Sequence, residues 1–350
     1  MQTSFVRNRD NRATRFRPSP TPIAQPEPAA KLPIPRQVGV IINPIVSRAT
    51  EAAGELLRQT AAAGIEREEF LTTRKSPGEQ QTKDALANGA DLIVVIGGDG
   101  TVRRVAGALA GSDVPLAVLP AGSGNVLARN LGLSPNELDM AVAHALAAPA
   151  LPVDLGWAKL TTAEQNDDQD AARPSAQEPF MVMAGIGRDA QTVASTRAFL
   201  KRRWGWGAYA ESGIRHALAG TLPMTVQFDD ANQREIDTWT LLAGLVPYVP
   251  AGIRVFPQAR INDGKLHALE VPIENALQWA AIAARGMGNP APKAKLRYTE
   301  ADHVVVTPQD RLPVQLDGDI FTDVTRLELS VQAAALRLRI PAERLTHNWV

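Results

Sequence analysis

Short runs of apolar residues alternate with alanine-rich stretches over the first half of the chain. The runs at residues 38–42, 92–96 and 116–119 consist mostly of β-branched and aliphatic residues, which is typical of strands buried on both faces. A further strand is expected at residues 69–72, and helices are expected at residues 51–63, 78–88, 102–110 and 125–131. Because strands that alternate with helices need crossover connections, the pattern predicts an α/β domain with a parallel, doubly wound sheet.

The second half of the chain has a different pattern, with many short strands separated by turn residues. The expected strands span residues 180–184, 224–228, 239–246, 267–271, 303–306, 327–331 and 336–340. Several short strands with turn signals between them favour an antiparallel arrangement. We therefore predict a mostly antiparallel β-sandwich C-terminal domain.

Composition suggests where these domains begin and end. Residues 1–36 combine six arginines with a proline-rich stretch and few apolar side chains, so we expect a disordered basic tail. The α/β domain then covers residues 37–150, and the β-rich domain covers residues 151–324. Within the second domain, residues 161–178 are polar and acidic without periodicity, which predicts a flexible insertion.

The overall charge and residue usage exclude several kinds of site. Lysine plus arginine and aspartate plus glutamate both total 37, so net charge gives no reason to expect a nucleic-acid partner. The absence of cysteine excludes disulfides, zinc–thiolate centres and cysteine nucleophiles. No apolar run approaches the roughly 20 residues of a membrane-spanning helix, and we expect a cytoplasmic protein.

A glycine-rich segment follows the apolar run at residues 92–96 and precedes a predicted helix. Its sequence is Gly97-Gly98-Asp99-Gly100-Thr101 and is called the first glycine loop below. At the carboxyl end of a parallel strand, glycines let backbone amides approach an anion, and the helix N-terminus adds partial positive charge. The loop therefore predicts a phosphate cradle. The Asp99 carboxylate would be unfavourable beside a phosphate unless a cation or a hydrogen-bond donor accompanies it.

A second glycine loop, residues 120–125, repeats this arrangement one strand and helix later. It contains Gly122, Ser123, Gly124 and Asn125. A single loop of this kind is as readily a tight strand-to-helix turn. Two loops on sequential strands favour one anion-binding crevice, and neither fits the P-loop or dinucleotide fingerprints.

These residues resemble the diacylglycerol kinase catalytic family, which includes bacterial lipid kinases and sphingosine kinases. The resemblance rests on both glycine loops and extends over roughly residues 37–341. The other matching segments are residues 40–44, 184–190, 256–266 and 316–319. It implies an N-terminal domain that holds the nucleotide, a C-terminal β-sandwich, a cleft between them, and a last segment, about residues 325–350, that returns to the first domain.

The resemblance also assigns the ATP site. One threonine after the second strand should lie near the nucleotide, and we favour Thr73 over Thr72. The remaining ATP-site residues are Gly97, Gly98, Asp99, Gly100, Thr101, Arg103, Arg104, Gly122, Ser123, Gly124 and Asn125. Arg103 and Arg104 stand where many relatives have asparagine and glutamate, so two cations are expected close to the first glycine loop.

Two further roles follow from the resemblance. Asp263 is similar to a metal-binding aspartate of bacterial relatives, where the backbone carbonyls of Arg260 and Lys265 would complete a Mg²⁺ site; Asn262-Asp263-Gly264 is also a good turn sequence. Asp319 stands at the position of the proton acceptor, where relatives often carry glutamate. Asp99 is expected to place magnesium or the nucleotide, with direct base catalysis as the alternative.

The resemblance therefore predicts an ATP-dependent lipid kinase that uses Mg²⁺. Diacylglycerol is the first candidate acceptor and a sphingoid base the second. The basic and aromatic segment at residues 197–209 suits peripheral contact with the inner membrane face, or a helix packed on the second domain. The alternatives are a NAD kinase, which also uses a Gly-Gly-Asp-Gly loop, and a non-catalytic lipid-binding regulatory protein.

Overall fold

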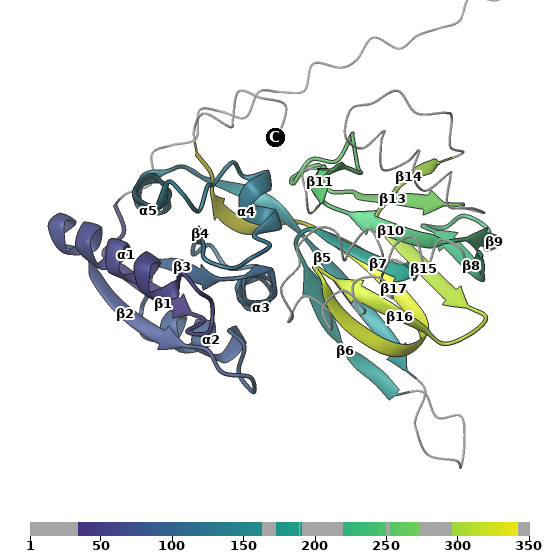
Figure 1. Cartoon of the computed structure of the whole chain (residues 1–350), viewed down its shortest axis with the longest axis horizontal. Coiled ribbons are helices and arrows are strands. Elements are labelled where there is room, and N and C mark those ends of the chain that lie inside the picture. The colour runs from purple at the N-terminus through teal and green to yellow at the C-terminus, as the bar shows by residue number, and fades with distance from the viewer. Residues whose placement is uncertain are drawn as a thin grey trace, which may run out of the picture.

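The computed structural model describes residues 34–162, 173–188, 190, 220–249, 253–272 and 296–341. Two lobes lie side by side, and Figure 1 shows helices around the first and antiparallel strands throughout the second. The first lobe has parallel strands and the second is mostly antiparallel, so the predicted fold class is confirmed.

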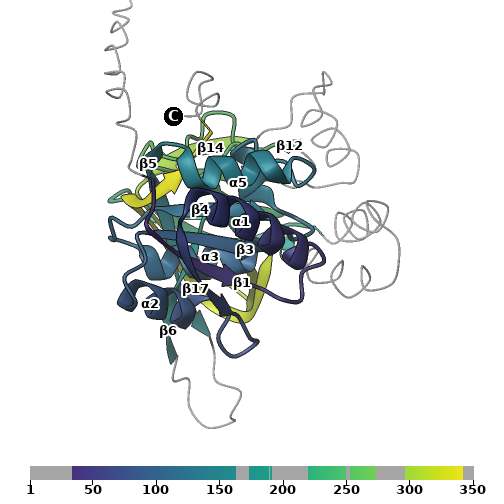
Figure 2. The same cartoon turned by 90° about the vertical axis from the view of Figure 1, so that its left-hand side faces the viewer.

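The N-terminal lobe is a four-stranded parallel sheet in the order β4-β3-β1-β2. Its strands are β1 (Gln37–Ile42), β2 (Glu66–Leu71), β3 (Leu92–Gly97) and β4 (Leu116–Pro120). Its helices are α1 (Ala49–Ala63), α2 (Glu79–Ala87), α3 (Asp99–Leu109), α4 (Val126–Asn130) and α5 (Leu138–Ala147). Helix α1 packs with α5 and α2 packs with α3, on opposite faces of the sheet (Figure 2).

The C-terminal lobe consists of two antiparallel sheets that share one long strand, β17 (Asp319–Arg339). One sheet has the order β14-β13-β10-β7-β16-β17, and the other joins β9, β8, β15, β17, β5 and β6. The strands of the first sheet are β7 (Met183–Gly187), β10 (Thr240–Gly244), β13 (Leu266–Val271), β14 (Arg297–Ala301) and β16 (Leu312–Leu316). Those of the second are β5 (Ala150–Thr162), β6 (Arg173–Phe180), β8 (Leu222–Phe228), β9 (Arg234–Thr238) and β15 (His303–Pro308).

A short ribbon and the end of the β5–β6 pair complete this lobe. A separate ribbon is formed by β11 (Tyr248–Val249) and β12 (Ile253–Arg254). Strand β5 ends at Thr162 and β6 begins at Arg173, so both ends of the stretch at residues 161–178 are strand, and residues 163–172 lie outside the described part.

Strand β17 connects the two lobes. Its first residues pair with β16, most of its length pairs with β5, and Leu338 pairs in parallel with Leu116 of β4. The sequence predicts two strands here, but the structure has one, with a register irregularity between Gln332 and Leu336 at which Ala334 has a positive φ of 51°. The sheet of the N-terminal lobe therefore continues into the C-terminal lobe.

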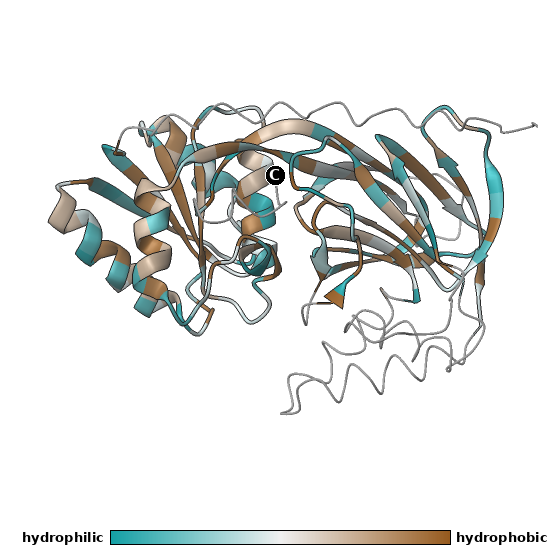
Figure 3. Cartoon of the chain, turned by 90° about the horizontal axis from the view of Figure 1, so that it is seen from above, coloured by the Kyte–Doolittle hydropathy of each residue, from teal (hydrophilic) through white to brown (hydrophobic). Residues whose placement is uncertain are grey.

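Buried apolar side chains form two clusters. The first fills the N-terminal lobe and continues into the C-terminal lobe through Met181, Trp239 and Phe256, and the second lies within the strands of the C-terminal lobe. Figure 3 shows hydrophobic residues concentrated on the central strands of the first lobe and alternating with hydrophilic ones along strands of the second. The difference arises because the parallel strands of the first lobe are buried on both faces, whereas the antiparallel strands of the second are buried mainly on one.

Among the described residues, no helix is both long and apolar enough to span a bilayer.

Candidate functional site

The two glycine loops lie against each other at the carboxyl ends of β3 and β4. A Cβ atom on Gly122 would lie 2.6 Å from the Cα atom of Gly98, so the two backbones touch at these glycines. A Cβ atom on Gly97 would lie 2.8 Å from the Cβ atom of Thr101. Real side chains do not tolerate such distances, and glycine is therefore required for the two loops to meet.

Asp99 connects the first glycine loop to the helix that follows the second. Its Oδ1 atom accepts hydrogen bonds from the amides of Val126 and Leu127, at 2.7 and 3.4 Å. Burial raises the pKa of the Asp99 carboxyl, and these amide hydrogen bonds oppose the rise. The carboxylate thus caps α4, because its charge faces the N-terminal amides of that helix.

The N-terminus of α3 has no such cap. Its N-cap residue, Gly98, has an extended backbone and no side chain that could accept a hydrogen bond. The first amides of an α-helix have no partner within the helix. Of the two helix starts at this edge, α3 is therefore the one that offers amides to an external anion.

Two asparagines hold the loops in shape. Asn43, directly after β1, donates from Nδ2 to Thr101 Oγ1 at 3.1 Å. Asn125 has a positive φ of 49°, and its Oδ1 atom accepts a hydrogen bond from the Gly122 amide at 2.9 Å. The tip of the second loop, Ser123 and Gly124, remains exposed beside the α3 N-terminus.

Asp317 fixes the turn between β16 and β17. Its buried carboxylate accepts hydrogen bonds from the amides of Met181, Val182 and Met183, at 2.7, 2.9 and 2.9 Å. Burial raises the pKa of Asp317 to about 6. The three amide hydrogen bonds and the nearby positive charge of Arg103 both oppose that rise. The turn that carries the next acidic residue, Asp319, is therefore held against the start of β7.

Asp319, from the C-terminal lobe, lies against the first turn of α3. Its Oδ2 atom would lie 3.0 Å from a Cβ atom on Gly100, and it accepts a hydrogen bond from Arg103 Nη2 at 2.8 Å. Its side chain is 36% exposed. The structure thus brings the predicted proton acceptor next to the predicted phosphate cradle, from residues far apart in the sequence.

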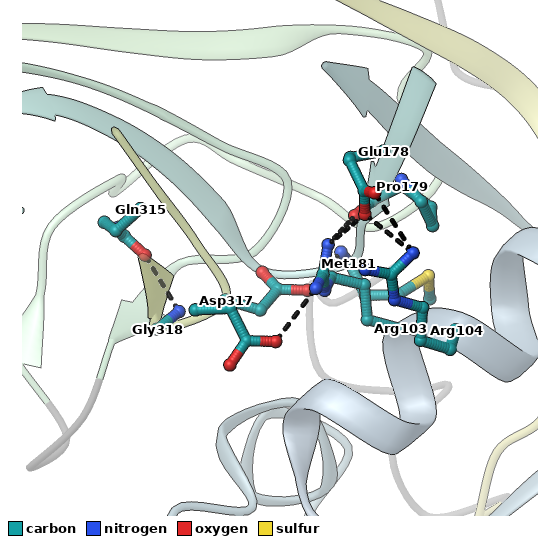
Figure 4. A network of polar contacts seen from close by, with 9 residues as sticks. Arg103, Arg104, Glu178, Pro179, Met181, Gln315, Asp317 and Gly318 are labelled. Atoms are coloured by element: carbon teal, nitrogen blue, oxygen red, sulfur yellow. Dashed lines mark hydrogen bonds and ion pairs between the residues drawn. The ribbon is translucent and has the colours of Figure 1, made fainter. Parts of the chain in front are cut away.

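Arg103 and Arg104 extend from α3 toward β6 in the C-terminal lobe, as Figure 4 shows. Arg103 Nη1 lies 3.0 Å from Glu178 Oε2, and Arg104 Nη1 lies 2.9 Å from the same atom. Both guanidinium groups therefore pair with carboxylates of the second lobe, although the sequence resemblance places these residues in the ATP site.

The predicted metal turn has the hydrogen bonds of an aspartate-stabilised turn. The Asp263 carboxylate accepts from the amides of Arg260 and Lys265, each at 3.0 Å, and its Oδ2 atom lies 2.8 Å from His267 Nε2. In the described part of the chain, no group of three or more His, Asp or Glu side chains is arranged to hold a metal ion. The Mg²⁺ assignment at this turn stays a prediction.

Thr73 lies in the connection that follows β2, two strands away from β3. Its hydroxyl accepts a hydrogen bond from the Ser76 amide at 3.1 Å and its side chain is exposed, whereas Thr72 is buried. Residues 197–209, for which the sequence predicts membrane contact, lie outside the described residues.

Sequence reasoning gave no role to four residues that shape the cleft, namely Asn43, Asn130, Glu178 and Asp317. Asn130 is buried and binds both the carbonyl and the amide of Tyr248 in the other lobe, at 2.7 and 3.1 Å. Asn43 and Asp317 lie in segments that match the family, but the resemblance gave neither a role of its own. The contacts of Glu178, Asn130 and Asp317 described here join residues 74 or more positions apart.

Comparisons with known proteins agree with this arrangement. The profile described as "Diacylglycerol kinase catalytic domain" matches residues 37–158. A protein of Pseudomonas aeruginosa named "Probable lipid kinase YegS-like" is 30% identical over 311 residues, which is 85% of this chain and 94% of that protein. The "Diacylglycerol kinase" of Bacillus subtilis is 24% identical over 290 residues, covering 81% of this chain and 90% of its own.

Solved structures show the same fold at lower identity. A diacylglycerol kinase from Bacillus anthracis superposes with a TM-score of 0.61 and 19% identity, covering 88% of this chain and 98% of its own. Yeast NADH kinase, solved with NADH, has a TM-score of 0.53 and 10% identity, covering 90% of this chain and 85% of its own. Both likenesses concern the fold alone.

Proposed function

The chain belongs to the diacylglycerol kinase catalytic family, a family of phosphotransferases with an alcohol group as acceptor, and we propose that it transfers the γ-phosphate of ATP to a hydroxyl of diacylglycerol or a related lipid. The observation that carries the proposal is the position of Asp319. A carboxylate from the C-terminal lobe lies beside the uncapped N-terminus of α3.

The triphosphate of ATP would bind at that N-terminus. The first glycine loop offers main-chain amides there, and the exposed tip of the second loop, Ser123 and Gly124, lies opposite them. Thr101, held by Asn43, completes the first loop. Asp99 has a different part in this proposal: its carboxylate keeps the second loop in place through the α4 amides rather than touching ATP.

Asp319 would accept the proton of the lipid alcohol. As the alcohol oxygen forms its bond to the γ-phosphorus, the bond from that phosphorus to the β,γ-bridging oxygen breaks, and ADP leaves with the bond electrons. Such a transfer depends mainly on alignment, charge neutralisation and a group that takes the proton. Magnesium bound with ATP would supply part of the charge neutralisation.

The metal assignment at Asp263 adds no step to this mechanism. Both carboxylate oxygens of Asp263 already accept N–H groups, and Oδ2 also lies beside His267. An aspartate in this setting stabilises the turn that leads into β13. We therefore propose that magnesium enters as the complex with ATP.

Substitution of Asp319 by asparagine tests the proposal most directly. Asparagine keeps the shape of the side chain but is a poor proton acceptor, so turnover with ATP should fall by about 100-fold or more. ATP binding, measured by calorimetry, should change little. Wild-type turnover in the variant would contradict the assignment.

The acceptor is tested by offering alternatives to the wild-type protein. ATP consumption is compared in mixed micelles containing diacylglycerol, in micelles containing a sphingoid base, and with NAD. We expect turnover with diacylglycerol, in keeping with the name of the Bacillus subtilis relative. Turnover with NAD alone would favour the NAD kinase reading, and no turnover with any acceptor would favour a non-catalytic lipid-binding protein.

A further inference from the structure

Arg103 is the most buried charged side chain in the cleft. Its side chain is 1% exposed, and its guanidinium group lies 5.8 Å from the centre of the Phe321 ring. Removing a charge from water is unfavourable unless partners compensate it. The partners of Arg103 therefore indicate why a cation is retained at this position.

The partners come from two separate strands of the other lobe. Arg103 Nη2 donates to Asp319 Oδ2 at 2.8 Å, while Nη1 donates to Glu178 Oε2 at 3.0 Å and to the Pro179 carbonyl at 3.3 Å. One rigid guanidinium group thus spans the end of β6 and the start of β17. A lysine could not hold both carboxylates in this geometry, because its ammonium group is a single point of charge.

Arg104 balances the charges of this cluster. It pairs with Glu178 through Nη1, so two arginines face two carboxylates, Glu178 and Asp319. Glu178 has a second cation to neutralise it. Arg103 pairs with both carboxylates.

We infer that Arg103 is a positioning residue that holds the Asp319 carboxylate against the first turn of α3, and that Glu178 holds the other side of the same guanidinium group in place. This inference rests on the proposed function of Asp319. It assigns to Arg103 and Glu178 a role in setting the proton acceptor, in place of contact with ATP.

The inference predicts a loss of kcat for two substitutions. Arg103→Met removes both guanidinium contacts, the one with Asp319 Oδ2 and the one with Glu178 Oε2. Glu178→Gln keeps Arg103 and removes the charge of its second partner.

Glu178→Gln should lower kcat by less than Arg103→Met does, because the contact between Arg103 and Asp319 remains. Glutamine has nearly the shape of glutamate, so this variant keeps the fold even where Arg103→Met fails to fold. In Arg103→Met, kcat at neutral pH should fall by about tenfold or more, and the KM for ATP should change by less than about threefold. A residue that bound ATP would instead raise this KM.

Arg234→Met is the matched control. Arg234 forms the same kind of cluster away from the cleft, since it pairs with the buried Glu270 and lies 5.6 Å from the centre of the Phe228 ring. Its loss should lower the melting temperature without changing kcat. A merely structural role of Arg103 would give the same pattern as this control.

The outcomes separate this inference from the proposed function. If Asp319→Asn is inactive and Arg103→Met, or Glu178→Gln where Arg103→Met does not fold, lowers kcat with little change in the KM for ATP, the inference holds. If Asp319→Asn is inactive but these variants keep the wild-type kcat or raise the KM for ATP, the inference is wrong and the proposed function stands. If Asp319→Asn retains full turnover, the proposed function fails first.

Discussion

The two lobes contribute different kinds of chemical group to the candidate site. The N-terminal lobe contributes main-chain groups, where Gly98 and Gly122 touch and the first turn of α3 lies open. The C-terminal lobe contributes side-chain charge, with Asp317 in the turn before β17, Asp319 at the start of β17 and Glu178 on β6. The difference suits the division of work in phosphoryl transfer, because an anion is bound by amides and a proton is taken by a carboxylate.

The two halves also differ in how far apart their partners lie in the sequence. Asp99 and Val126 are 27 positions apart, whereas Arg103 and Asp319 are 216 positions apart. The first half is a local product of two consecutive strand-loop-helix units. The second half exists only when both lobes have folded against each other.

The largest expected effect comes from forcing the glycine loops apart. In Gly122→Ala, the new methyl group would meet the Gly98 backbone at 2.6 Å, and one loop must move. Because misplacement of about 1 Å can lower a rate by 100-fold, we expect a loss of kcat of that order. ATP-dependent turnover measures it.

Gly54→Ala is the control for that substitution. Gly54 lies within α1, and no heavy atom lies within 4 Å of a Cβ atom placed on it. Alanine there should raise the free energy of unfolding by about 0.5 to 1 kcal/mol and leave turnover unchanged. Normal activity in Gly122→Ala would show that close contact between the loops is not needed.

A smaller effect, on stability rather than rate, is expected from Asp317→Asn. An amide in place of the carboxylate turns one acceptor atom into a donor that faces main-chain N–H groups, which should lower the free energy of unfolding by about 1 to 3 kcal/mol. Urea unfolding at pH 7 measures the change. An unchanged unfolding midpoint would contradict this role.

The same variant should alter the pH dependence of stability. The pKa of Asp317 is raised to about 6 from an ordinary value of 3.8, so the folded state binds this proton more tightly than the unfolded state. The protonated group therefore contributes stability below about pH 4, and this contribution is lost as pH rises through 6. Melting temperatures from pH 4 to 7 should show a smaller decline in Asp317→Asn than in the wild type.

The smallest effect is expected from Asp99→Asn, which contrasts the aspartates of the two lobes. Asparagine keeps an oxygen that can accept the Val126 amide hydrogen bond. If Asp99 only caps α4, kcat should fall by less than about tenfold, against about 100-fold or more for Asp319→Asn. A loss in Asp99→Asn as large as in Asp319→Asn would restore the alternative that Asp99 is the base or binds magnesium.

The sequence predicted the local half of the site and little of the other. The fold class is confirmed, and the strands ending at Gly97 and Pro120 with their helices lie where apolar runs and glycines indicate them. Helix α5 was missed because its residues are apolar on nearly every side and give no helical period. The bulge near Ala334 made one strand resemble two.

The charged side chains that the C-terminal lobe contributes to the site could not be derived from the sequence pattern alone. Glu178 lies in a polar stretch that looks like an insertion, and its value as a partner depends on α3 lying beside β6. Asp317 is one of several aspartates next to glycine, and only burial against residues 181–183 distinguishes it. The role of Asp319 came from family resemblance, and its contact with Arg103 is visible only in three dimensions.

The long strand β17 has a mechanical consequence. Asp319 is its first residue, and Leu338, near its other end, is hydrogen-bonded into the sheet that carries both glycine loops. Together with β5 it forms a two-stranded ribbon across the waist of the molecule. A change in the distance between Asp319 and the glycine loops must therefore bend these two strands, because the lobes are joined here by paired strands and not by a single loop.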